Sequence, residues 1–366
     1  MSKGRGGTVD KGLAAAGMDE GSRLKALVPP LLAWYEEHGR PLPWREDPQP
    51  YRVWISEIML QQTRIEAVKP YYDRFIRELP DVAALAAVED DRLMKLWEGL
   101  GYYNRARNLK KAAVVVEREY GGRLPGEYGE LVKLPGIGNY TAGAIASISY
   151  GQAVPAVDGN VLRVVSRVLA SREDIRKQST KKRVEALLAE AMPERDAGSF
   201  NQGLMEVGET LCIPNGHPLC GGCPFHPLCL ASLRGQTDQI PVKAPPPKRR
   251  VEERTVCVLE RDGYIGLRKR EDKGLLASLY ELPNAEGHLA PEELAETFHL
   301  NREAIFSLER LPDAKHIFSH VEWHMAGYRV RLARAMPEGY IAARKEDLKT
   351  IYPLPNAFGR YIKLIN

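Results

Sequence analysis

Two glycines within the segment 134–141, Leu-Pro-Gly-Ile-Gly-Asn-Tyr-Thr, constrain this chain more than any other feature. Apolar segments that fit helices lie on both sides, at 128–132 and 142–148. Because Gly136 and Gly138 lack side chains, the backbone between those helices can turn tightly and another chain can approach it closely. The N–H groups at the start of the second helix would then form a phosphate site. A Pro-Gly-x-Gly turn that only joins two ordinary helices is the alternative.

The composition permits a nucleic-acid partner without requiring one. The net charge is +4 and the isoelectric point is about 8.6, so the whole-protein field is only weakly attractive to phosphates. Basic clusters occur at 105–111, 181–183 and 248–250. Each of these clusters, taken alone, is equally consistent with a solvated surface.

The length and residue mixture predict a globular protein of more than one domain. The chain has 366 residues, of which 44% are hydrophobic and 27% are charged, and one compact domain is usually shorter. No apolar run approaches the roughly 20 residues of a membrane span. The N-terminus also carries no apolar signal core, so we expect no secretion.

The chain divides into four segments by pattern. Residues 1–22 are rich in Gly and Ala without periodicity, and we expect them to be disordered. Residues 23–235 are predicted to form a helical module, because apolar residues recur at three- and four-residue steps. Residues 236–250 contain Pro-Pro-Pro-Lys-Arg-Arg and predict a semi-rigid linker. An α+β domain is expected at 251–366.

The C-terminal segment has the pattern of strands. Apolar runs at 255–259 and 264–267 flank Arg-Asp-Gly, which is typical of a β-hairpin. Cys257 lies on the first of these strands and is expected to be a buried core thiol. The remaining expected elements are strands at 304–308, 324–332 and 339–343 and a helix near 291–298.

Four of the five cysteines crowd into one short loop with the spacing C-x7-C-x2-C-x5-C, namely Cys212, Cys220, Cys223 and Cys229. An odd total in a chain without a signal argues against a disulfide framework and for a metal. Four thiolates in one loop suit an iron–sulfur cube, although the spacing matches neither ferredoxin pattern. Zinc is the alternative, because His217 and His226 lie in the same loop and only one Cys-x-x-Cys knuckle is present.

Glu57 is a lone carboxylate in an otherwise apolar helical segment at 51–63. If it is buried there, its pKa should rise, because a low-dielectric setting penalises the ionised form. A carboxyl that stays protonated near neutral pH is suited to general acid catalysis. The alternative is a surface Glu on the polar side of an amphipathic helix.

Asp158 directly precedes a long helix with apolar periodicity, so it is expected to cap that helix. Backbone N–H groups at such a cap should keep the pKa of Asp158 low and the carboxylate ionised. An ionised Asp158 beside a protonated Glu57 would be an acid and anion pair able to cleave a glycosidic bond. Capping and catalysis are compatible roles, and the sequence does not separate them.

The order of these motifs along the chain resembles that of the helix–hairpin–helix DNA glycosylases. The motifs are 54–63, 99–105, 134–141, 157–160 and the cysteine loop, and they resemble most closely the adenine DNA glycosylases of the MutY family. The resemblance runs from about Leu31 to the C-terminus. It implies a mostly α helix–hairpin–helix glycosylase module with an iron–sulfur cluster loop, followed by an α+β Nudix-like domain. Within the module, a six-helix part would span about 43–150, and a cluster part would combine 23–42 with 151–235.

Tyr140 distinguishes between branches of this superfamily. Relatives of the endonuclease III type, which excise pyrimidines and nick the strand, carry a nucleophilic lysine at this place in the hairpin. A lysine amine can form a Schiff base with the sugar, whereas tyrosine cannot. The resemblance therefore implies a monofunctional enzyme. A bifunctional pyrimidine glycosylase/lyase and a catalytically silent lesion-binding protein are the alternatives.

The resemblance implies base excision repair of adenine mispaired opposite 8-oxoguanine or guanine in double-stranded DNA. The adenine would be flipped out of the stack, protonated by Glu57, and its sugar cation stabilised by Asp158. The remaining residues that match family roles are positioners of this pair (Tyr140, Asn160), an adenine contact (Gln202), wedges into the duplex (Gln62, Tyr102), contacts near the lesion (Thr63, Leu100), backbone contacts (Gly136, Gly138) and ligands of a 4Fe-4S cluster (Cys212, Cys220, Cys223, Cys229).

The segment Phe318-Ser319-His320 stands where the family has its motif for recognising 8-oxoguanine. The hydroxyl of Ser319 can both donate and accept, as discrimination of an oxidised guanine edge requires. No Arg-Glu-x-x-Glu-Glu run follows Glu281, so we expect no Nudix pyrophosphatase activity. The family usually has six residues between its first two cysteines, and this chain has seven. The resemblance further implies a monomer in the bacterial cytoplasm, associated with the nucleoid.

Overall fold

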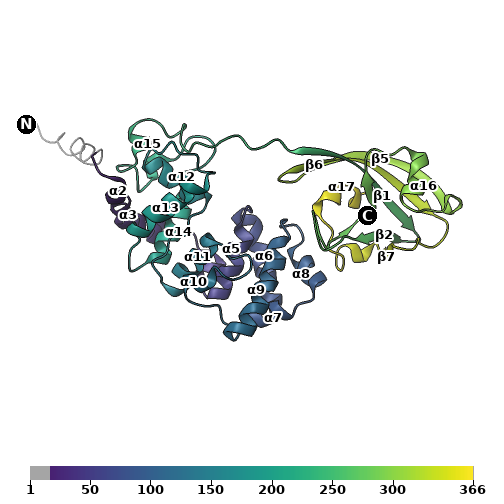
Figure 1. Cartoon of the computed structure of the whole chain (residues 1–366), viewed down its shortest axis with the longest axis horizontal. Helices are drawn as coiled ribbons and strands as arrows, with labels where there is room; N and C mark the ends of the chain where they lie inside the picture. Colours follow the sequence, from purple (N-terminus) through teal and green to yellow (C-terminus); the bar gives the residue numbers. More distant parts are fainter. Residues whose placement is uncertain (1–16, 366) are drawn as a thin grey trace, which may run out of the picture. The chain divides into compact units, whose positions relative to one another are not determined.

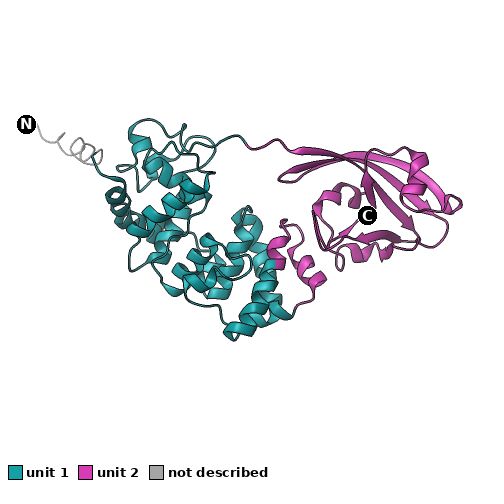
Figure 2. Cartoon of the chain, viewed as in Figure 1, with its two compact units in different colours: residues 1–87, 108–245 teal, residues 88–107, 246–366 magenta. Residues whose placement is uncertain are grey.

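Figure 1 shows the computed structural model of the chain, which describes residues 17–365. The described residues form two compact units, coloured separately in Figure 2. Unit 1 comprises 17–87 and 108–245, and unit 2 comprises 88–107 and 246–365. Unit 2 therefore combines the C-terminal domain with a short segment that the sequence pattern assigned to the helical module.

Most of the expected disordered tail, residues 1–16 of 1–22, lies outside the described residues. The first described helix, α2 (Glu20–Ala26), begins at Glu20 rather than at Arg23. The reason is a cap, because the carboxylate of Asp19 accepts the N–H of Ser22 at 2.9 Å. Such a cap leaves no apolar periodicity by which the sequence pattern could show the helix start.

Unit 1 is helical, as predicted. Its helices are α2, α3 (Val28–His38), α4 (Pro43–Glu46), α5 (Pro50–Leu60), α6 (Ile65–Glu78), α7 (Val82–Ala87), most of α9 (Asn104–Tyr120), α10 (Tyr128–Leu131), α11 (Asn139–Tyr150), α12 (Gly159–Val168), α13 (Gln178–Ala191), α14 (Ala197–Thr210), η1 (Cys220–Gly222) and α15 (Leu230–Leu233). Proline occupies the first turn of α3, α4 and α5, where its missing N–H costs no hydrogen bond.

Helix α14 is the central element of unit 1, and it packs against α3, α11 and α12. Helix α11 packs on its other side against α5. The shared apolar core includes Leu31 of α3, Val161 and Val165 of α12, and Phe200 and Leu204 of α14, all of them buried. This packing brings together the starts of α11 and α12 and the middle of α5, which are the three places where the sequence put catalytic residues.

Unit 2 is built on one twisted sheet, in which seven strands of the described residues take part. The strands are β1 (Arg250–Arg261), β2 (Tyr264–Lys269), β3 (Tyr280–Glu281), β4 (Asn284–Glu286), β5 (Ile305–Ile317), β6 (Val321–Leu332) and β7 (Ile341–Arg344). Their main order is β3-β2-β1-β6-β5, with β4 paired to β1 and β7 to β2. Only the β1–β6 pair is parallel among the described ladders, with Arg250 opposite Val321.

Unit 2 also contains several short helices. They are α8 (Asp90–Trp97), η2 (Pro291–Glu293), α16 (Leu294–Thr297), η3 (Arg302–Ala304), η4 (Glu346–Leu348), η5 (Asn356–Phe358) and α17 (Gly359–Ile362). Trp323 and Val256 pack with Phe358 on one face of the sheet. Cys257 packs with Phe298 on the other face and is fully buried, which confirms the expectation of a core thiol.

The five strands expected in the C-terminal domain are present, but β1 and β5 are much longer than expected, and the short strands β3 and β4 were not expected. The expected hairpin is β1–β2, with Asp262 and Gly263 both at positive φ, as a tight hairpin turn requires. The strand expected at 304–308 continues as β5 to Ile317. A bulge between Leu311 and Ala314 interrupts its pairing and accommodates Pro312 within the strand.

Every helix within residues 17–365 is too short or too polar to cross a lipid bilayer.

Candidate active site

Glu57 lies on α5 with only 6% of its surface exposed, so the alternative of a surface glutamate is wrong. Burial raises the pKa of Glu57 from 4.5 to about 7, against the lowering effect of a hydrogen bond from Tyr140. The Tyr140 hydroxyl donates that bond to Oε2 over 2.5 Å. Near neutral pH the carboxyl therefore exists in both protonation states, which is what a group that first donates and later accepts a proton needs.

Tyr140 is the second residue of α11, and its hydroxyl also lies 3.6 Å from Sδ of Met205 on α14. Burial, and then the nearby carboxyl groups of Glu57 and Asp158, raise the pKa of Tyr140 well above its usual range. The phenol therefore stays neutral and acts as a hydrogen-bond donor. Tyr140 occupies the hairpin position at which, by the family resemblance, relatives of the endonuclease III type carry a nucleophilic lysine.

Asp158 caps α12, as predicted. One carboxylate oxygen accepts the N–H of Val161 at 2.7 Å, and the other accepts Nδ2 of Asn160 at 3.0 Å. The expectation of a low pKa differs from the structure, because burial raises the pKa of Asp158 and outweighs the hydrogen bonds from Val161 and Asn160. The cap pattern predicted the hydrogen bonds but could not show how completely the carboxyl is removed from water.

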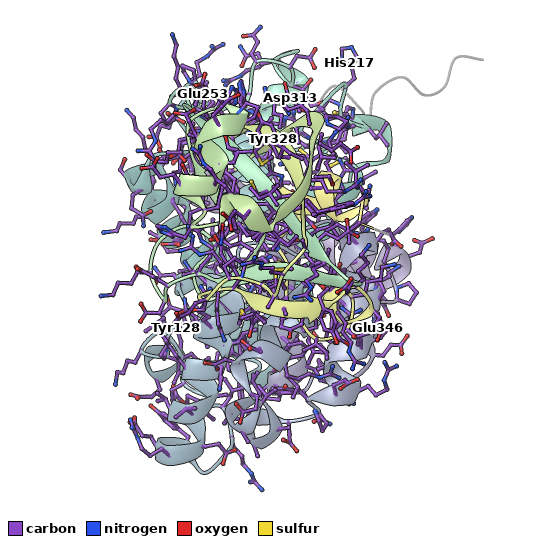
Figure 3. All side chains as sticks on the ribbon, turned by 90° about the vertical axis from the view of Figure 1, so that its right-hand side faces the viewer. Tyr128, His217, Glu253, Asp313, Tyr328 and Glu346 are labelled. Atoms are coloured by element: carbon purple, nitrogen blue, oxygen red, sulfur yellow. The ribbon has the colours of Figure 1, made fainter. Side chains whose placement is uncertain are left out.

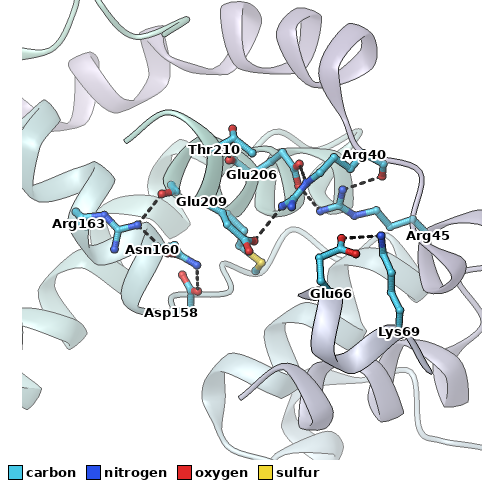
Figure 4. Close-up of polar contacts among 12 residues, drawn as sticks. Arg40, Arg45, Glu66, Lys69, Asp158, Asn160, Arg163, Glu206, Glu209 and Thr210 are labelled. Atoms are coloured by element: carbon cyan, nitrogen blue, oxygen red, sulfur yellow. Dashed lines mark hydrogen bonds and ion pairs between the residues drawn. The ribbon is translucent and has the colours of Figure 1, made fainter. Parts of the chain in front are cut away.

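Asn160 lies between Asp158 and Arg163 (Figure 4), and through Arg163 it is linked to the cysteine loop. Its side-chain oxygen accepts Nη2 of Arg163 at 2.8 Å, and Nε of the same arginine donates to the carbonyl of Cys212 at 2.6 Å. The helices approach closely here, because a Cβ on Gly208 would lie 2.7 Å from Cβ of Asn160. Asp158 is thus positioned from both the start of α12 and the end of α14.

All four loop cysteines line one pocket between α12 and the loop 211–237, together with apolar residues such as Val164 and Phe225. Burial raises the pKa of the Cys223 thiol to about 12 and that of Cys229 to about 11. Nη1 of Arg167 lies 3.2 Å from Sγ of Cys212 and supplies positive charge beside the thiols. Soft thiolate donors, apolar walls and a buried arginine fit an anionic iron–sulfur group.

The structure does not support either histidine of the loop as a metal ligand. The side chain of His217 is 91% exposed, lies at the periphery in Figure 3 and is 3.3 Å from Asp238. His226 borders the pocket, but its Nδ1 lies 3.2 Å from the hydroxyl of Ser232. Among residues 17–365, no three His, Cys, Asp or Glu side chains are arranged around a single ion.

The structure shows two buried polar groups that the sequence analysis missed. The first is Asn201, fully buried beside Gln202 on α14. Its oxygen accepts the N–H of Ala156 at 3.0 Å, and its nitrogen donates to Oγ of Ser147 at 2.8 Å and to the carbonyl of Val154 at 2.9 Å. Asn201 therefore fixes the segment that leads to Asp158. A polar residue at a core position of an amphipathic helix was the signal that could have identified it.

The second missed group is Glu206, one turn after Gln202 and also buried. Figure 4 shows Arg40 and Arg45 directed at it. Nη2 of Arg45 is 2.7 Å from Oε2 of Glu206, and Nε of Arg40 pairs with Oε1. The positive charge of Arg45 also lowers the pKa of Glu57 slightly against the effect of burial. Because these partners are more than 150 positions apart in the chain, no local pattern indicated the cluster.

The glycine hairpin at 134–141 joins α10 to α11. Gly136 has φ +77°, and a Cβ there would lie 2.6 Å from Cβ of Asn108. Gly138 is the N-cap of α11 with φ −93°, and nothing described lies within 4 Å of its potential Cβ. Among the described residues no side chain caps this helix. Its first N–H groups are therefore available to an anion.

Both residues expected to wedge into a duplex lie in strained turns. Gln62 has φ +59° and Tyr102 has φ +48°, a region that few residues other than glycine occupy. Tyr102 is 49% exposed, while Leu100 beside it is buried. Gln62 and Thr63 directly follow α5 in unit 1, whereas Leu100 and Tyr102 belong to unit 2.

The segment Phe318-Ser319-His320 forms the tight loop between β5 and β6. The ring of Phe318 packs edge-on against Trp323, 5.0 Å between centroids, and anchors the loop. Ser319 and His320 are exposed. Oγ of Ser319 lies 2.8 Å from the hydroxyl of Tyr102, and both residues belong to unit 2.

The predicted site residues thus form two groups, one in each unit. Unit 1 brings together Glu57, Tyr140, Asp158 and Asn160, and it also holds Gln202, the hairpin glycines and the cysteine pocket. Unit 2 brings Tyr102 next to Ser319.

Comparison with known proteins agrees with this geometry. Residues 55–194 match the family described as HhH-GPD superfamily base excision DNA repair protein, and residues 255–364 match the NUDIX domain. A thermostable thymine-DNA glycosylase of known structure is 29% identical, with a TM-score of 0.53 over 58% of this chain and 98% of that one. These matches confirm the expected fold class.

Two curated proteins named adenine DNA glycosylase extend the match to both domains. The mouse protein is 35% identical and aligns with 83% of this chain and 70% of its own length. The protein from Buchnera aphidicola subsp. Baizongia pistaciae is 34% identical and aligns with 80% of this chain and 82% of its own length. Because relatives of one name, 35% and 34% identical, align with 83% and 80% of this chain, the chain belongs to the adenine DNA glycosylase (MutY) family.

Proposed function

We propose that this enzyme removes adenine paired with 8-oxoguanine, with Glu57 as the general acid, Asp158 as the stabilising anion and Tyr140 as their positioner. The observation that carries the proposal is the buried Glu57 carboxyl, with a pKa of about 7 and a neutral phenol donating to it. Family membership makes the protein a monofunctional DNA glycosylase of base excision repair. The substrate pair and the residue roles are the proposed part.

In the first step, adenine leaves the base stack and its ring accepts a proton from Glu57. Protonation makes the base a neutral leaving group, and the bond between the base nitrogen and C1′ of the sugar breaks with both electrons going to the base. Glu57 is left ionised, and its hydrogen bond from Tyr140 becomes stronger because its acceptor is now charged. Because burial raises its pKa, Glu57 is protonated in a larger fraction of molecules at neutral pH than an exposed glutamic acid would be, so it has a proton to donate.

In the second step, the positive charge that develops on the sugar is stabilised by the Asp158 carboxylate. Its two oxygens are already held by Val161 and Asn160, so the charge is positioned before the substrate arrives. The ionised Glu57 then accepts a proton from water as the water attacks C1′. The products are free adenine and an abasic site, and Glu57 regains its proton.

The four loop cysteines would hold a 4Fe-4S cluster. Such a group would supply a covalent tie within the loop 212–229 and negative charge beside Arg167. Arg163 bonds the Cys212 carbonyl and Asn160 together, so the loop and Asp158 are coupled through the protein's own residues. The extra residue before Cys220 lies in an exposed loop, where an insertion costs little.

The protein acts on DNA by virtue of its family, and we propose that it does so as a monomer on double-stranded substrates. A cytoplasmic, nucleoid-associated location stays a prediction. The monomer is tested by light scattering with and without a short duplex, where a doubled mass would contradict it.

The test of the function uses duplexes with a central adenine opposite either 8-oxoguanine or guanine, with and without alkali. We expect adenine release under single-turnover conditions and strand breaks only after alkali. Glu57→Gln should abolish release yet still bind the duplex, because glutamine keeps the shape and accepts from Tyr140. Release by Glu57→Gln at the wild-type rate would contradict the general acid. No wild-type preference for 8-oxoguanine over guanine would contradict the proposed substrate.

A further inference from the structure

Helix α8 is fastened to the C-terminal domain by three charged side chains, Asp91, Lys95 and Glu98, which we call the clasp. The helix and the sheet both belong to unit 2, shown in magenta in Figure 2. No clasp residue belongs to the sequence motifs or to the proposed catalytic group. The clasp nevertheless lies directly before the turn that carries Leu100 and Tyr102.

Lys95 is the centre of the clasp, and its side chain is only 9% exposed. Its Nζ donates to the carbonyl oxygens of Leu348 at 3.1 Å and Tyr352 at 3.0 Å. It also pairs with Oε2 of Glu98 at 2.6 Å. These three partners match the three N–H donors of the ammonium group.

The two acidic residues complete the attachment. Oε1 of Glu98 accepts the N–H of Leu354 at 2.8 Å, so this carboxylate bonds to Lys95 on its own segment and to the backbone of the C-terminal domain. Asp91 accepts from Nζ of Lys269 and from the hydroxyl of Tyr280, each at 2.7 Å. Two separate parts of the C-terminal domain, β2–β3 and the segment 348–354, are therefore held to one short helix.

The turn after α8 is rigid, so the position of the helix fixes the position of Tyr102. Nε1 of Trp97 donates to the carbonyl of Gly101 at 3.1 Å, and Nη2 of Arg105 donates to that carbonyl and to Leu100, each at 3.1 Å. The guanidinium of Arg105 lies over the rings of Trp97 and Tyr102. The left-handed backbone of Tyr102 is held by these contacts.

We propose that Asp91, Lys95 and Glu98 are positioning residues for lesion recognition, because they hold α8 on the C-terminal domain and so keep Tyr102 against Ser319. This inference rests on the proposed function, removal of adenine opposite 8-oxoguanine, and on the role in recognising that lesion which the family resemblance implies for Ser319. The clasp residues touch neither base nor sugar. They hold Tyr102 and the loop 318–320 in a fixed relative position, so that Tyr102 is already in place when the loop binds the lesion.

The experiment compares rates of adenine release opposite 8-oxoguanine and opposite guanine for wild type, Lys95→Met, Ser319→Ala and the double variant. Lys95→Met keeps the length of the side chain and removes its three donors. We expect it to lower the ratio of the two rates about tenfold. We expect Ser319→Ala to cause no further loss in the Lys95→Met background, because both changes act on one step.

A matched control is Lys69→Met on α6, which removes a lysine from another i,i+3 ion pair, with Glu66, that is exposed (Figure 4). It should leave the ratio unchanged. If Lys95→Met fails to fold, the exchange Asp91→Lys with Lys269→Asp replaces it. Each single change should lower the ratio, and the pair should restore most of it, which loss of stability alone would not do.

The outcomes separate the clasp from the function on which it rests. A wild-type enzyme without preference for 8-oxoguanine would overturn the proposed substrate, and the clasp proposal with it. A wild-type preference that Lys95→Met leaves intact would overturn the clasp alone. Losses from Lys95→Met and Ser319→Ala that simply multiply would also overturn it, because they would place the two residues in independent steps.

Discussion

At the scale of single residues, Glu57 shows how burial converts a common side chain into an acid that works at neutral pH. The first step requires the protonated form of Glu57, and the pKa of this carboxyl is about 7. The release rate should therefore be constant below pH 7 and fall above it. Tyr140 donates a hydrogen bond that lowers this pKa. We therefore expect the fall to move to higher pH in Tyr140→Phe, as measured by single-turnover rates between pH 5 and 9. An unchanged profile would show that another group limits the rate.

The same pKa shift affects stability. The folded protein binds a proton at Glu57 that the unfolded chain releases between pH 4.5 and about 7. Stability is therefore present at low pH and is lost as the pH rises through 7, by an amount on the order of 3 kcal/mol at most. Glu57→Gln removes this loss and should raise the melting temperature at pH 8.5 more than at pH 5. Equal changes at both pH values would contradict the buried, titrating carboxyl.

The buried side chain of Asn201 should contribute to both stability and catalysis. Asn201→Ala would leave the N–H of Ala156 and the carbonyl of Val154 without their bonds inside the core. We expect a loss of about 2–4 kcal/mol in the free energy of unfolding. Catalysis should also fall, because the segment before Asp158 is no longer fixed. Gln202→Ala, next in the chain and only half-buried, is the control, and its unfolding in urea should be close to wild type.

At the scale of elements, the two glycines of the hairpin do different work. Position 136 requires glycine for folding, because its φ is +77° and a Cβ there would collide with Asn108. Position 138 has a negative φ and open space around a potential Cβ. Gly136→Ala should cost about 1–3 kcal/mol of stability. Gly138→Ala should fold normally and bind undamaged duplex more weakly, because its methyl group would stand where a phosphate approaches. Melting temperatures and duplex affinities of both variants test this, and equal melting temperatures would contradict it.

Local patterns predicted the elements where a single stretch of chain determines the outcome. The cap at Asp158, the β1–β2 hairpin and the buried Cys257 all follow from neighbouring residues. The continuation of β5 past a proline did not follow, because a bulge depends on the partner strand β6. The cluster of Glu206 with Arg40 and Arg45 was also missed, since its members meet only after α14 packs against α3.

At the scale of the whole molecule, the division into units differs from the division of the sequence. The linker composition at 236–250 predicted a boundary, but nothing in the pattern of 88–107 indicated that this segment packs with the C-terminal domain. Its attachment depends on Lys95 reaching carbonyl groups about 250 positions away. Sequence motifs identified Tyr102 and Ser319 separately. Only the fold shows that the Tyr102 hydroxyl lies 2.8 Å from Oγ of Ser319.

The contact between Tyr102 and Ser319 should contribute to the preference for 8-oxoguanine. Ser319→Ala removes the hydroxyl that bonds to Tyr102 and, as proposed, to the lesion. We expect release of adenine opposite guanine to change little, while the advantage of 8-oxoguanine falls about tenfold, the value of one hydrogen bond to a polar edge. Tyr102→Phe keeps the wedge and removes only its half of the contact. It should therefore lose less of the preference than Ser319→Ala, and an equal or larger loss would mean that the Tyr102 hydroxyl itself recognises the lesion.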